Sequence, residues 1–362
     1  LEFRRVLFRS WLAAVIVVPV FFNVYSSRIF EPDKITLLRS LTLIIIAAWI
    51  IKLFEEGRTK SSMQNNIWIQ FKDLIKIPII LPVLILAFVY LLATLLSITP
   101  RVSIFGSYQR LQGTYTTLSY LVVFFAMVIN IRRRVQVERL ITTVIIASLP
   151  VSLYGVLQKY KIDPSPWGGD VSIRIAANLG NSIFIGAYII MVFPLTIMRI
   201  VESFEALLTE RGDLLPNFSR ATVYVFIATL QVIALYFSGS RGPLLGWGAS
   251  LVFIWLGLSL IWRKRWLTIS GAILSIVAAT FLITLNIPDG PLKQLQTAPE
   301  LGRFGKLLDI ESPTGRVRTL IWSGAYELVQ PHEPIEFPEG GKDSLNPIRP
   351  LIGYGPESMY VA

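Results

Sequence analysis

Residues 221–262 read ATVYVFIATLQVIALYFS, then GSRG, then PLLGWGASLVFIWLGLSLIW. Two long apolar runs are joined here by a turn of four residues that holds a single arginine. Each run approaches the roughly 20 residues that an α-helix needs to cross the hydrocarbon core of a bilayer. The stretch therefore predicts two transmembrane helices connected by a tight turn.

The rest of the chain repeats this pattern. Of its 362 residues, 53% are hydrophobic and 16% are charged, and the mean hydropathy is +0.60, whereas soluble domains carry about 25% charged residues. These values exclude a disordered chain, a coiled coil and an ordinary cytosolic enzyme. We expect an all-α polytopic membrane protein with about nine transmembrane helices, at the apolar runs near 11–26, 35–54, 77–98, 114–131, 140–158, 182–198, 221–238, 243–262 and 267–286.

Three regions are expected along the chain. Residues 1–10 (LEFRRVLFRS) look like the translation of a sequencing-adapter oligonucleotide and are set aside as an artefact. Residues 11–286 form the transmembrane helical bundle. Residues 287–362 form a large extracytoplasmic loop, which we expect to be truncated because the chain reads as an internal fragment of a longer protein.

The distribution of basic residues predicts the orientation. The connections 52–76, 132–139, 199–220 and 263–265 hold 15 Lys and Arg, whereas the alternate connections hold 8. Basic residues accumulate in cytoplasmic loops, so the first set and the N-terminus are predicted to be cytoplasmic. Residues 287–362 then lie outside, and they carry 7 basic and 10 acidic residues. Membrane topology therefore explains the net charge of +11 better than nucleic-acid binding does.

Few residues offer metal or acid–base chemistry. The chain has no cysteine and one histidine, which excludes disulfides, thiolate metal sites and multi-histidine metal centres. The histidine, His332, lies among prolines and glutamates in a stretch typical of irregular loop, so it is a weak candidate for a general base. Glu31 and Asp33 could form an acidic metal-binding pair, but acids at a helix start more simply complement the helix dipole. We expect no cofactor.

Arg241 lies in the turn that joins the two runs quoted above. Gly239 and Gly242 flank the arginine and permit unusual backbone angles, and Pro243 suits the first position of the next helix. Arg241 would then lie at a helix N-terminus, beside unpaired N–H groups and the positive end of the dipole. That combination predicts an anion site suited to phosphate. The alternative is an arginine that reaches toward the membrane interface for solvation.

Three more arginines lie in segments predicted to be external. Arg316 and Arg318 begin RVRTLIWSGAYEL (residues 316–328), whose apolar residues recur at helical spacing and predict an interfacial helix at the outer leaflet. Two arginines there can clamp a pyrophosphate, although contact with ordinary headgroups is the simpler interpretation. Arg174 precedes Asn178–Asn181, which should cap the next span, and a stray charge beside a cap is again the simpler interpretation.

Three stretches, taken together, resemble the O-antigen ligase and O-antigen polymerase superfamily. They are NLGNSIFIGAYIIMVFPL (Asn178–Leu195), YFSGSRGPLL (Tyr236–Leu245), and Arg316–Trp322 followed by Gly353–Pro356. They are similar to the family's Gly-Asn entry into a span, its Ser-Arg-Gly signature, and the Arg-x-x-x-Trp helix and Gly-x-Gly segment of its large periplasmic loop. The resemblance covers about residues 150–356.

This resemblance implies a multi-pass glycosyltransferase of the bacterial cytoplasmic (inner) membrane. Its members move a glycan from undecaprenyl pyrophosphate to an acceptor hydroxyl on the outer face, without metal or nucleotide and with inversion. The implied partners are the undecaprenyl-pyrophosphate-linked glycan, an acceptor glycolipid, glycan or protein, and the lipid bilayer, but not nucleic acid. The sequence does not distinguish ligase from polymerase.

Carried over residue by residue, Arg241 matches the Ser-Arg-Gly arginine and Arg318 matches the loop arginine four residues before Trp322. These two are the expected catalytic residues. Arg241, Arg316, Arg318 and Arg174 are expected to bind the substrate, with Arg316 as a close rival of Arg318. The family's catalytic histidine lies beyond the Gly-x-Gly segment, where His332 does not match it. The chain as given is therefore expected to lack the base and to be inactive.

Other functions remain open at this point. A polyprenyl-glycan flippase or exporter would also need external cationic residues, a metal-dependent glycosyltransferase could use Glu31 and Asp33, and a membrane scaffold would need no site. The central parts of the nine runs contain no Asp, Glu or Lys. Pumps and ion-coupled carriers usually place such groups near the midplane, so the pattern favours an enzyme acting at the outer interface.

Overall fold

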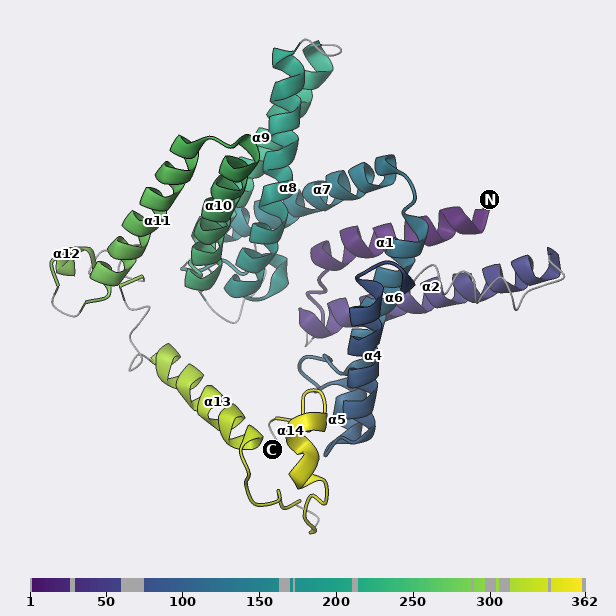
Figure 1. Cartoon of the computed structure of the whole chain (residues 1–362). Coiled ribbons are helices and arrows are strands. Elements are labelled where there is room, and N and C mark those ends of the chain that lie inside the picture. The colour runs from purple at the N-terminus through teal and green to yellow at the C-terminus, as the bar shows by residue number, and fades with distance from the viewer. Residues whose placement is uncertain are drawn as a thin grey trace. The chain divides into compact units, whose positions relative to one another are not determined.

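The computed structural model describes residues 2–26, 30–59, 75–162, 170–171, 173–209, 214–287, 290–296, 304–305, 313–337 and 340–359. Helices dominate the described part of the chain, and its one β-type contact is an isolated bridge between Glu336 and Lys342. The longer helices, shown in Figure 1, are α1 (Glu2–Val20), α2 (Glu31–Thr59), α4 (Ile80–Leu95), α6 (Thr114–Asn130), α7 (Arg134–Lys159), α8 (Ser182–Leu208), α9 (Leu214–Ser238), α10 (Arg241–Trp262), α11 (Arg265–Leu285) and α13 (Pro313–Val329). The short elements are α5 (Pro100–Phe105), η1 (Ala177–Leu179), α12 (Lys293–Gln296), η2 (Asn346–Ile348) and α14 (Arg349–Ile352).

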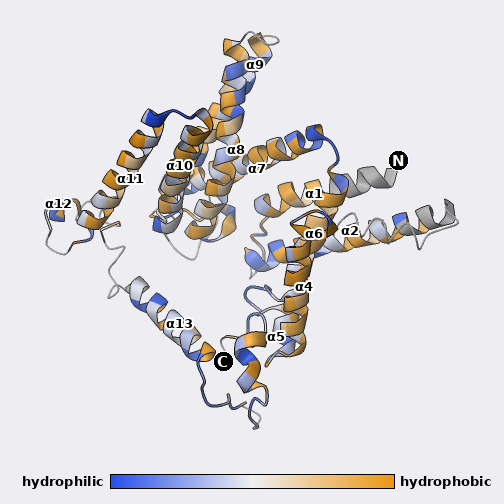
Figure 2. Ribbon diagram, in the orientation of Figure 1, coloured by the Kyte–Doolittle hydropathy of each residue, from blue (hydrophilic) through white to orange (hydrophobic). Residues whose placement is uncertain are grey.

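The chain is an all-α, multi-pass membrane protein by the length and apolarity of its helices. Six described helices are long and apolar enough to cross a membrane: part of α2 (Glu31–Lys52), α7, α8, α9, α10 and α11. Figure 2 shows apolar residues along them and polar residues in the connection between α10 and α11. Each of the nine predicted runs contains a helix, but the count of nine spans is not confirmed. The 16 residues of α4 and the 17 of α6 rise only about 24–26 Å, short of the ~30 Å of hydrocarbon.

The first helix differs from its predicted bounds. It begins at Glu2, so its backbone continues through the segment that sequence analysis set aside, and it ends at Val20 rather than at 26. Its last carbonyls find partners elsewhere, which explains the earlier end. The Lys34 ammonium donates to the carbonyls of Val18 at 3.1 Å, Pro19 at 2.9 Å and Phe21, and the Asn178 amide donates to those of Pro19 at 2.6 Å and Val20 at 2.8 Å.

The chain divides into two compact units. The first contains Leu1–Val151, Asn178–Gly180 and Leu328–Ala362, and the second contains Ser152–Ala177 and Asn181–Glu327. The end of the segment that was predicted to be external belongs to the same compact unit as the first helices.

The first unit has its core between α1, α2 and α6. Trp11, Ile45, Ala48 and Ala126 are buried there. Helix association in a bilayer depends on close packing and hydrogen bonds more than on apolar burial, and the two alanines allow a close approach. On α2, Arg39 adds polar contacts: its guanidinium donates to Thr116 Oγ1 at 3.0 Å and to the carbonyls of Phe105 at 2.7 Å and Leu111 at 2.9 Å.

The second unit is built on the pair α8 and α9. Buried Ile185 and Ile189 of α8 and Ala228 of α9 lie on their packed faces. A polar contact joins the two helices, because Gln231 Nε2 donates to Thr196 Oγ1 at 3.1 Å.

Helix α10 packs on α8 and forms a hairpin with α11. Gly186 of α8 lies so close to α10 that an added Cβ would come within 2.7 Å of the Pro243 side chain. Two turns further along α8 and one turn further along α10, the rings of Phe193 and Trp247 meet edge to face with centroids 5.5 Å apart. These contacts place the start of α10 against α8. The N-cap of α8 is Asn181, whose side chain accepts the Ile183 N–H at 2.9 Å, which confirms the predicted cap.

Segments predicted to be external contact one another within each unit. In the first unit, Ser97 Oγ donates to the Tyr354 carbonyl at 3.2 Å. In the second, the Ile175 N–H donates to the Phe237 carbonyl at 3.2 Å. Segments in direct contact share one side of a membrane, as the predicted orientation requires of these pairs.

Candidate functional site

The turn between α9 and α10 places Arg241 at the first residue of a membrane-spanning helix. Gly239 has a φ of +56°, a left-handed value that glycine adopts without steric cost. Ser240 is the N-cap, with extended backbone angles of −89° and 113°, and its carbonyl accepts the Leu244 N–H at 3.2 Å. The helix therefore begins at Arg241.

Two details differ from the prediction for this turn. Gly242 has no unusual backbone angle because it is the second residue of α10, and Pro243 is the third residue rather than the first. The reason is that the Ser240 carbonyl already accepts the first helical hydrogen bond. Proline at the third position is still favourable, since it lacks an N–H that would otherwise have no partner inside the helix.

The structure brings Arg174 to the same turn. Its Nε donates to the Ser238 carbonyl at 3.3 Å, and one terminal nitrogen donates to Ser240 Oγ at 3.1 Å. Ser238 and Ser240 are buried, and the Ser240 side chain makes no cap hydrogen bond to α10. Arg174 is thus hydrogen-bonded to the turn that carries Arg241. It is not a stray charge beside a cap, as the simpler interpretation had it.

Arg174, Arg241 and a helix N-terminus therefore meet at one turn: the Arg174 guanidinium binds the turn, and Arg241 is the first residue of the helix that follows it. Arg174 is exposed and Arg241 is half-buried. Gly242 is exposed, and no atom lies within 4 Å of the position that its Cβ would occupy. The first N–H groups of a helix have no acceptor within it and lie at the positive end of its dipole. This arrangement can bind an anion through charge-assisted hydrogen bonds without a metal ion.

Arg316 and Arg318 both lie on α13, and both are exposed. The prediction of a helix here is confirmed. Residues two apart on an α-helix do not face each other, so the two guanidiniums point to different sides of α13 and not along one face. Arg318 is an i,i+4 neighbour of Trp322, whereas Arg316 is not. Neither arginine makes a hydrogen bond or ion pair with another residue that the structure describes.

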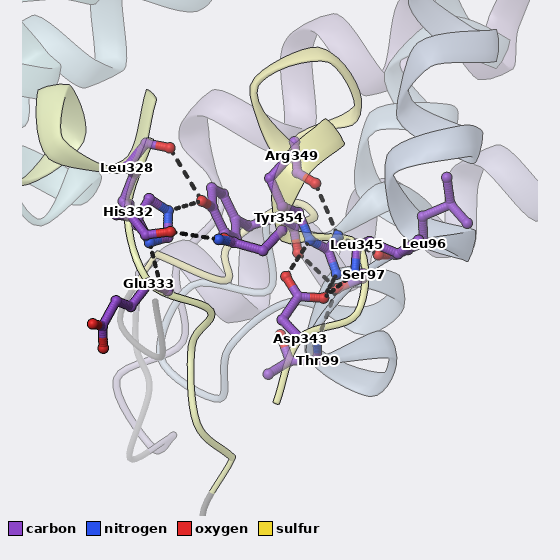
Figure 3. Close-up of polar contacts among 12 residues, drawn as sticks. Leu96, Ser97, Thr99, Leu328, His332, Glu333, Asp343, Leu345, Arg349 and Tyr354 are labelled. Atoms are coloured by element: carbon purple, nitrogen blue, oxygen red, sulfur yellow. Dashed lines mark hydrogen bonds and ion pairs between the residues drawn. The ribbon is translucent and has the colours of Figure 1, made fainter. Parts of the chain in front are cut away.

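His332 belongs to a separate cluster in the first unit (Figure 3). Its Nδ1 lies 2.6 Å from the Glu333 carbonyl oxygen, and its Nε2 lies 2.7 Å from the Tyr354 hydroxyl, which also donates to the Leu328 carbonyl at 3.1 Å. Both ring nitrogens are therefore engaged. The Glu333 carbonyl can only accept, so Nδ1 is the donor in that contact, and the two contacts together fix the orientation of the imidazole.

An ion pair buried beside this cluster holds residues 343–353 in place. Arg349 binds Asp343 through two hydrogen bonds of 2.6 and 2.8 Å, and both side chains are 3% exposed. The same guanidinium donates to the carbonyls of Leu96 at 2.5 Å and Gly353 at 3.0 Å. The hydrogen bonds from Arg349 hold the pKa of Asp343 below its ordinary value of 3.8, against the opposing effect of burial. Burial raises the pKa of the Tyr354 phenol, which keeps it protonated as a donor.

The segment after this pair docks on residues 96–107. Gly355 has a φ of +106°, and a Cβ there would overlap the Ser97 side chain, so only glycine fits. Ser103 Oγ donates to the Pro356 carbonyl at 2.9 Å, and the Ser107 N–H donates to the Glu357 carboxylate. The region predicted as irregular loop is thus irregular in backbone but held by many hydrogen bonds.

The acidic pair considered for a metal, Glu31 and Asp33, lies in the first turn of α2. Within the described residues, no group of three or more His, Asp or Glu side chains is close enough to hold a metal ion. Glu31 instead lines a cavity of about 300 Å³ together with Lys34, Gln112 and Tyr120, whose other walls are mostly apolar.

Sequence reasoning missed two residues that the second unit places near the turn. Ser240 was treated only as part of the Ser-Arg-Gly motif, although its hydroxyl receives Arg174. Gln158 was not considered, although it is a polar residue at the end of an apolar run, which was the available signal. Its side chain is fully buried beneath the segment that carries Arg174.

Comparison of the chain with protein-family models, with curated proteins and with solved structures found no match. The resemblance to the O-antigen ligase and polymerase superfamily therefore rests on the three quoted stretches alone.

Proposed function

We propose that the chain is an O-antigen ligase- or polymerase-like glycosyltransferase. In this proposal it moves a glycan from undecaprenyl pyrophosphate to an acceptor hydroxyl on the outer face of a bacterial cytoplasmic membrane. The acceptor is a glycolipid, a glycan or a protein. The single observation that supports it best is the convergence of Arg174 and Arg241 on the start of α10, at the position of the Ser-Arg-Gly motif.

The proposed chemistry follows from the charge of the leaving group. The acceptor oxygen attacks the anomeric carbon, the bond from that carbon to the pyrophosphate breaks, and its electron pair leaves with the pyrophosphate. Arg174, Arg241 and the N–H groups at the start of α10 stabilise the charge that develops there, which a metal ion does in other glycosyltransferases. One displacement inverts the anomeric centre. The proton of the acceptor passes to a base, a role not proposed for His332 because it precedes the Gly-x-Gly segment and does not match the position of the family's histidine.

The test is glycan transfer from the undecaprenyl pyrophosphate donor in membranes that carry the protein at matched expression. A charge-assisted hydrogen bond is worth about 1.5–3 kcal/mol, so Arg241→Ala should lower turnover roughly 10- to 150-fold. Arg241→Lys should also be impaired, because it keeps the charge but loses the planar fork. Arg101→Ala is the matched control, since Arg101 is an exposed arginine of another predicted external segment and is not part of the Ser-Arg-Gly motif.

Two outcomes contradict the proposal. If Arg241→Ala transfers glycan at a near wild-type rate, Arg241 only reaches toward the membrane interface and takes no part in transfer. If Arg241→Ala instead stops the lipid-linked glycan from reaching the outer face while transfer of glycan already there continues, the chain is an exporter.

A further inference from the structure

The segment that carries Arg174 is held by a glutamine from another helix. Gln158 lies one residue before the end of α7, and its side chain is 0% exposed. Its Oε1 accepts two consecutive main-chain N–H groups, from Ala176 at 3.0 Å and from Ala177 at 2.8 Å. One side-chain oxygen thus fixes the backbone two residues after Arg174.

The backbone at this point is strained and needs such support. Ala177 has a φ of +48°, a left-handed value that residues with a Cβ rarely adopt. Strained residues persist only where the surroundings over-determine them, and they gather at functional sites. Gln158 supplies a hydrogen bond directly to the strained residue.

Neighbouring contacts connect this backbone segment to the α9–α10 turn. Between Ala176 and Arg174, the Ile175 N–H donates to the Phe237 carbonyl at 3.2 Å. The end of α7 also covers Phe237, because the Tyr160 ring meets the Phe237 ring edge to face and the Lys159 ammonium lies 5.2 Å from its centroid. Arg174 then reaches Ser238 and Ser240 directly.

We infer that Gln158 is a positioning residue that sets Arg174 over the α9–α10 turn and thereby completes the anion site. It does not touch the anion itself; it acts through the backbone of Ala176 and Ala177. The inference rests on the proposed function only in taking a pyrophosphate as the natural anion.

The experiment reads the electrostatic potential at the turn without any substrate. The chain has no cysteine, so Gly242→Cys supplies a single thiol at an exposed helical position beside Arg241. In membrane vesicles, this thiol is labelled with a negatively charged and a positively charged methanethiosulfonate reagent. The ratio of the two rates reports the local positive charge, because cations attract the first reagent and repel the second.

In the Gly242→Cys background, Arg174→Ala should lower the ratio roughly fivefold, as expected for one charge lost near the surface. Gln158→Met removes the acceptor at nearly constant volume and should lower the ratio by a similar factor. Adding Gln158→Met to Arg174→Ala should change nothing further, because both act through one guanidinium.

Gln231→Met is the matched control. Gln231 is also fully buried in the second unit and also makes a side-chain hydrogen bond, to Thr196, but it lies on the α8–α9 face away from the turn. Its ratio should equal that of the Gly242→Cys background. If Gln158→Met does not fold, Gln158→Asn replaces it, since the shorter amide cannot reach both N–H groups.

An unchanged ratio in Gln158→Met or Gln158→Asn, or an equal fall in Gln231→Met, overturns the inference. The proposed function fails by a different result: wild-type membranes that show no glycan transfer, or transfer that is insensitive to Arg241→Ala. The labelling ratio can then still follow Gln158.

Discussion

Arg349 is a buried guanidinium with several acceptors: the Asp343 carboxylate and the carbonyls of Leu96 and Gly353. Removing one partner of a buried ion pair costs about 3–5 kcal/mol, because the other charge is left uncompensated. Leu96 is 253 positions away in sequence, so this one side chain joins the segment around Arg349 to the end of α4. We therefore expect the Arg349–Asp343 pair to determine whether the segment that carries it docks on the end of α4.

Acid should release this segment. The pKa of Asp343 is held below its ordinary 3.8, chiefly by the hydrogen bonds from Arg349. Such a group stabilises the folded state fully above its ordinary pKa, and the contribution is lost as the pH falls through the lowered pKa of the folded state. We expect the Ile98 amide, which donates to the Tyr354 carbonyl, to lose hydrogen-exchange protection below a pH of about 3.8.

Asp343→Asn supplies the control for this measurement. Without the carboxylate, protection of the Ile98 amide should be lower at neutral pH and should no longer fall in the acid range. An acid response that survives Asp343→Asn would assign it to another group, such as the Glu357 carboxylate on Ser107.

Among the secondary-structure elements, α13 presents its two arginines on different faces. Arg318 shares a face with Trp322, and the Arg-x-x-x-Trp motif of the superfamily has the same spacing of four residues. In the proposed function only the arginine beside the tryptophan belongs to the donor site. Arg316 instead shares its face of α13 with Ser323 and Glu327, which are also exposed.

The two arginines should therefore differ when they are replaced singly. Arg318→Ala should lower glycan transfer roughly 10-fold or more, as the loss of one charge-assisted contact does, while Arg316→Ala should stay within about 2-fold of wild type. Transfer is measured at matched expression, with each variant serving as the charge-matched control for the other. Equal losses would show that both arginines reach the substrate, and a larger loss for Arg316→Ala would reverse the assignment.

For the whole molecule, the contacts between predicted external segments test the orientation only indirectly. A direct test uses single cysteines in the cysteine-free chain. Ser240 is 1% exposed and would label poorly, so Gly242 and Ser344, which are both exposed, are the better positions. Lys264, exposed between α10 and α11, represents the predicted cytoplasmic side.

We expect Gly242→Cys and Ser344→Cys to react with an impermeant thiol reagent in intact cells, because the basic clusters place the opposite loops inside. Lys264→Cys should react only after lysis. If only Lys264→Cys reacts in intact cells, the orientation is the opposite of the predicted one, and the proposed site lies on the cytoplasmic face.

The pattern of apolar residues predicted the helices well, because the hydrocarbon core of a bilayer offers no hydrogen-bond partners to the backbone N–H and C=O groups. Every apolar run became a helix because helical hydrogen bonds are made within the segment. The cap at Asn181 and the helix around Trp322 were predicted for the same local reason. The limits of α1 were not, because its end depends on Lys34 and Asn178, which lie outside the helix.

The sequence by itself determined the class of the protein, the places of its helices and the start of α10 as a candidate anion site. Only the tertiary structure decided which residues join that site. Arg174 and Ser238 are 64 positions apart, and Gln158 reaches Ala176 across 18. Such contacts follow from how helices and connections pack, and neither composition nor periodicity encodes them. His332 is a further example. The sequence pattern suggested no partner for its side chain, whereas the packing of the chain places it against Tyr354.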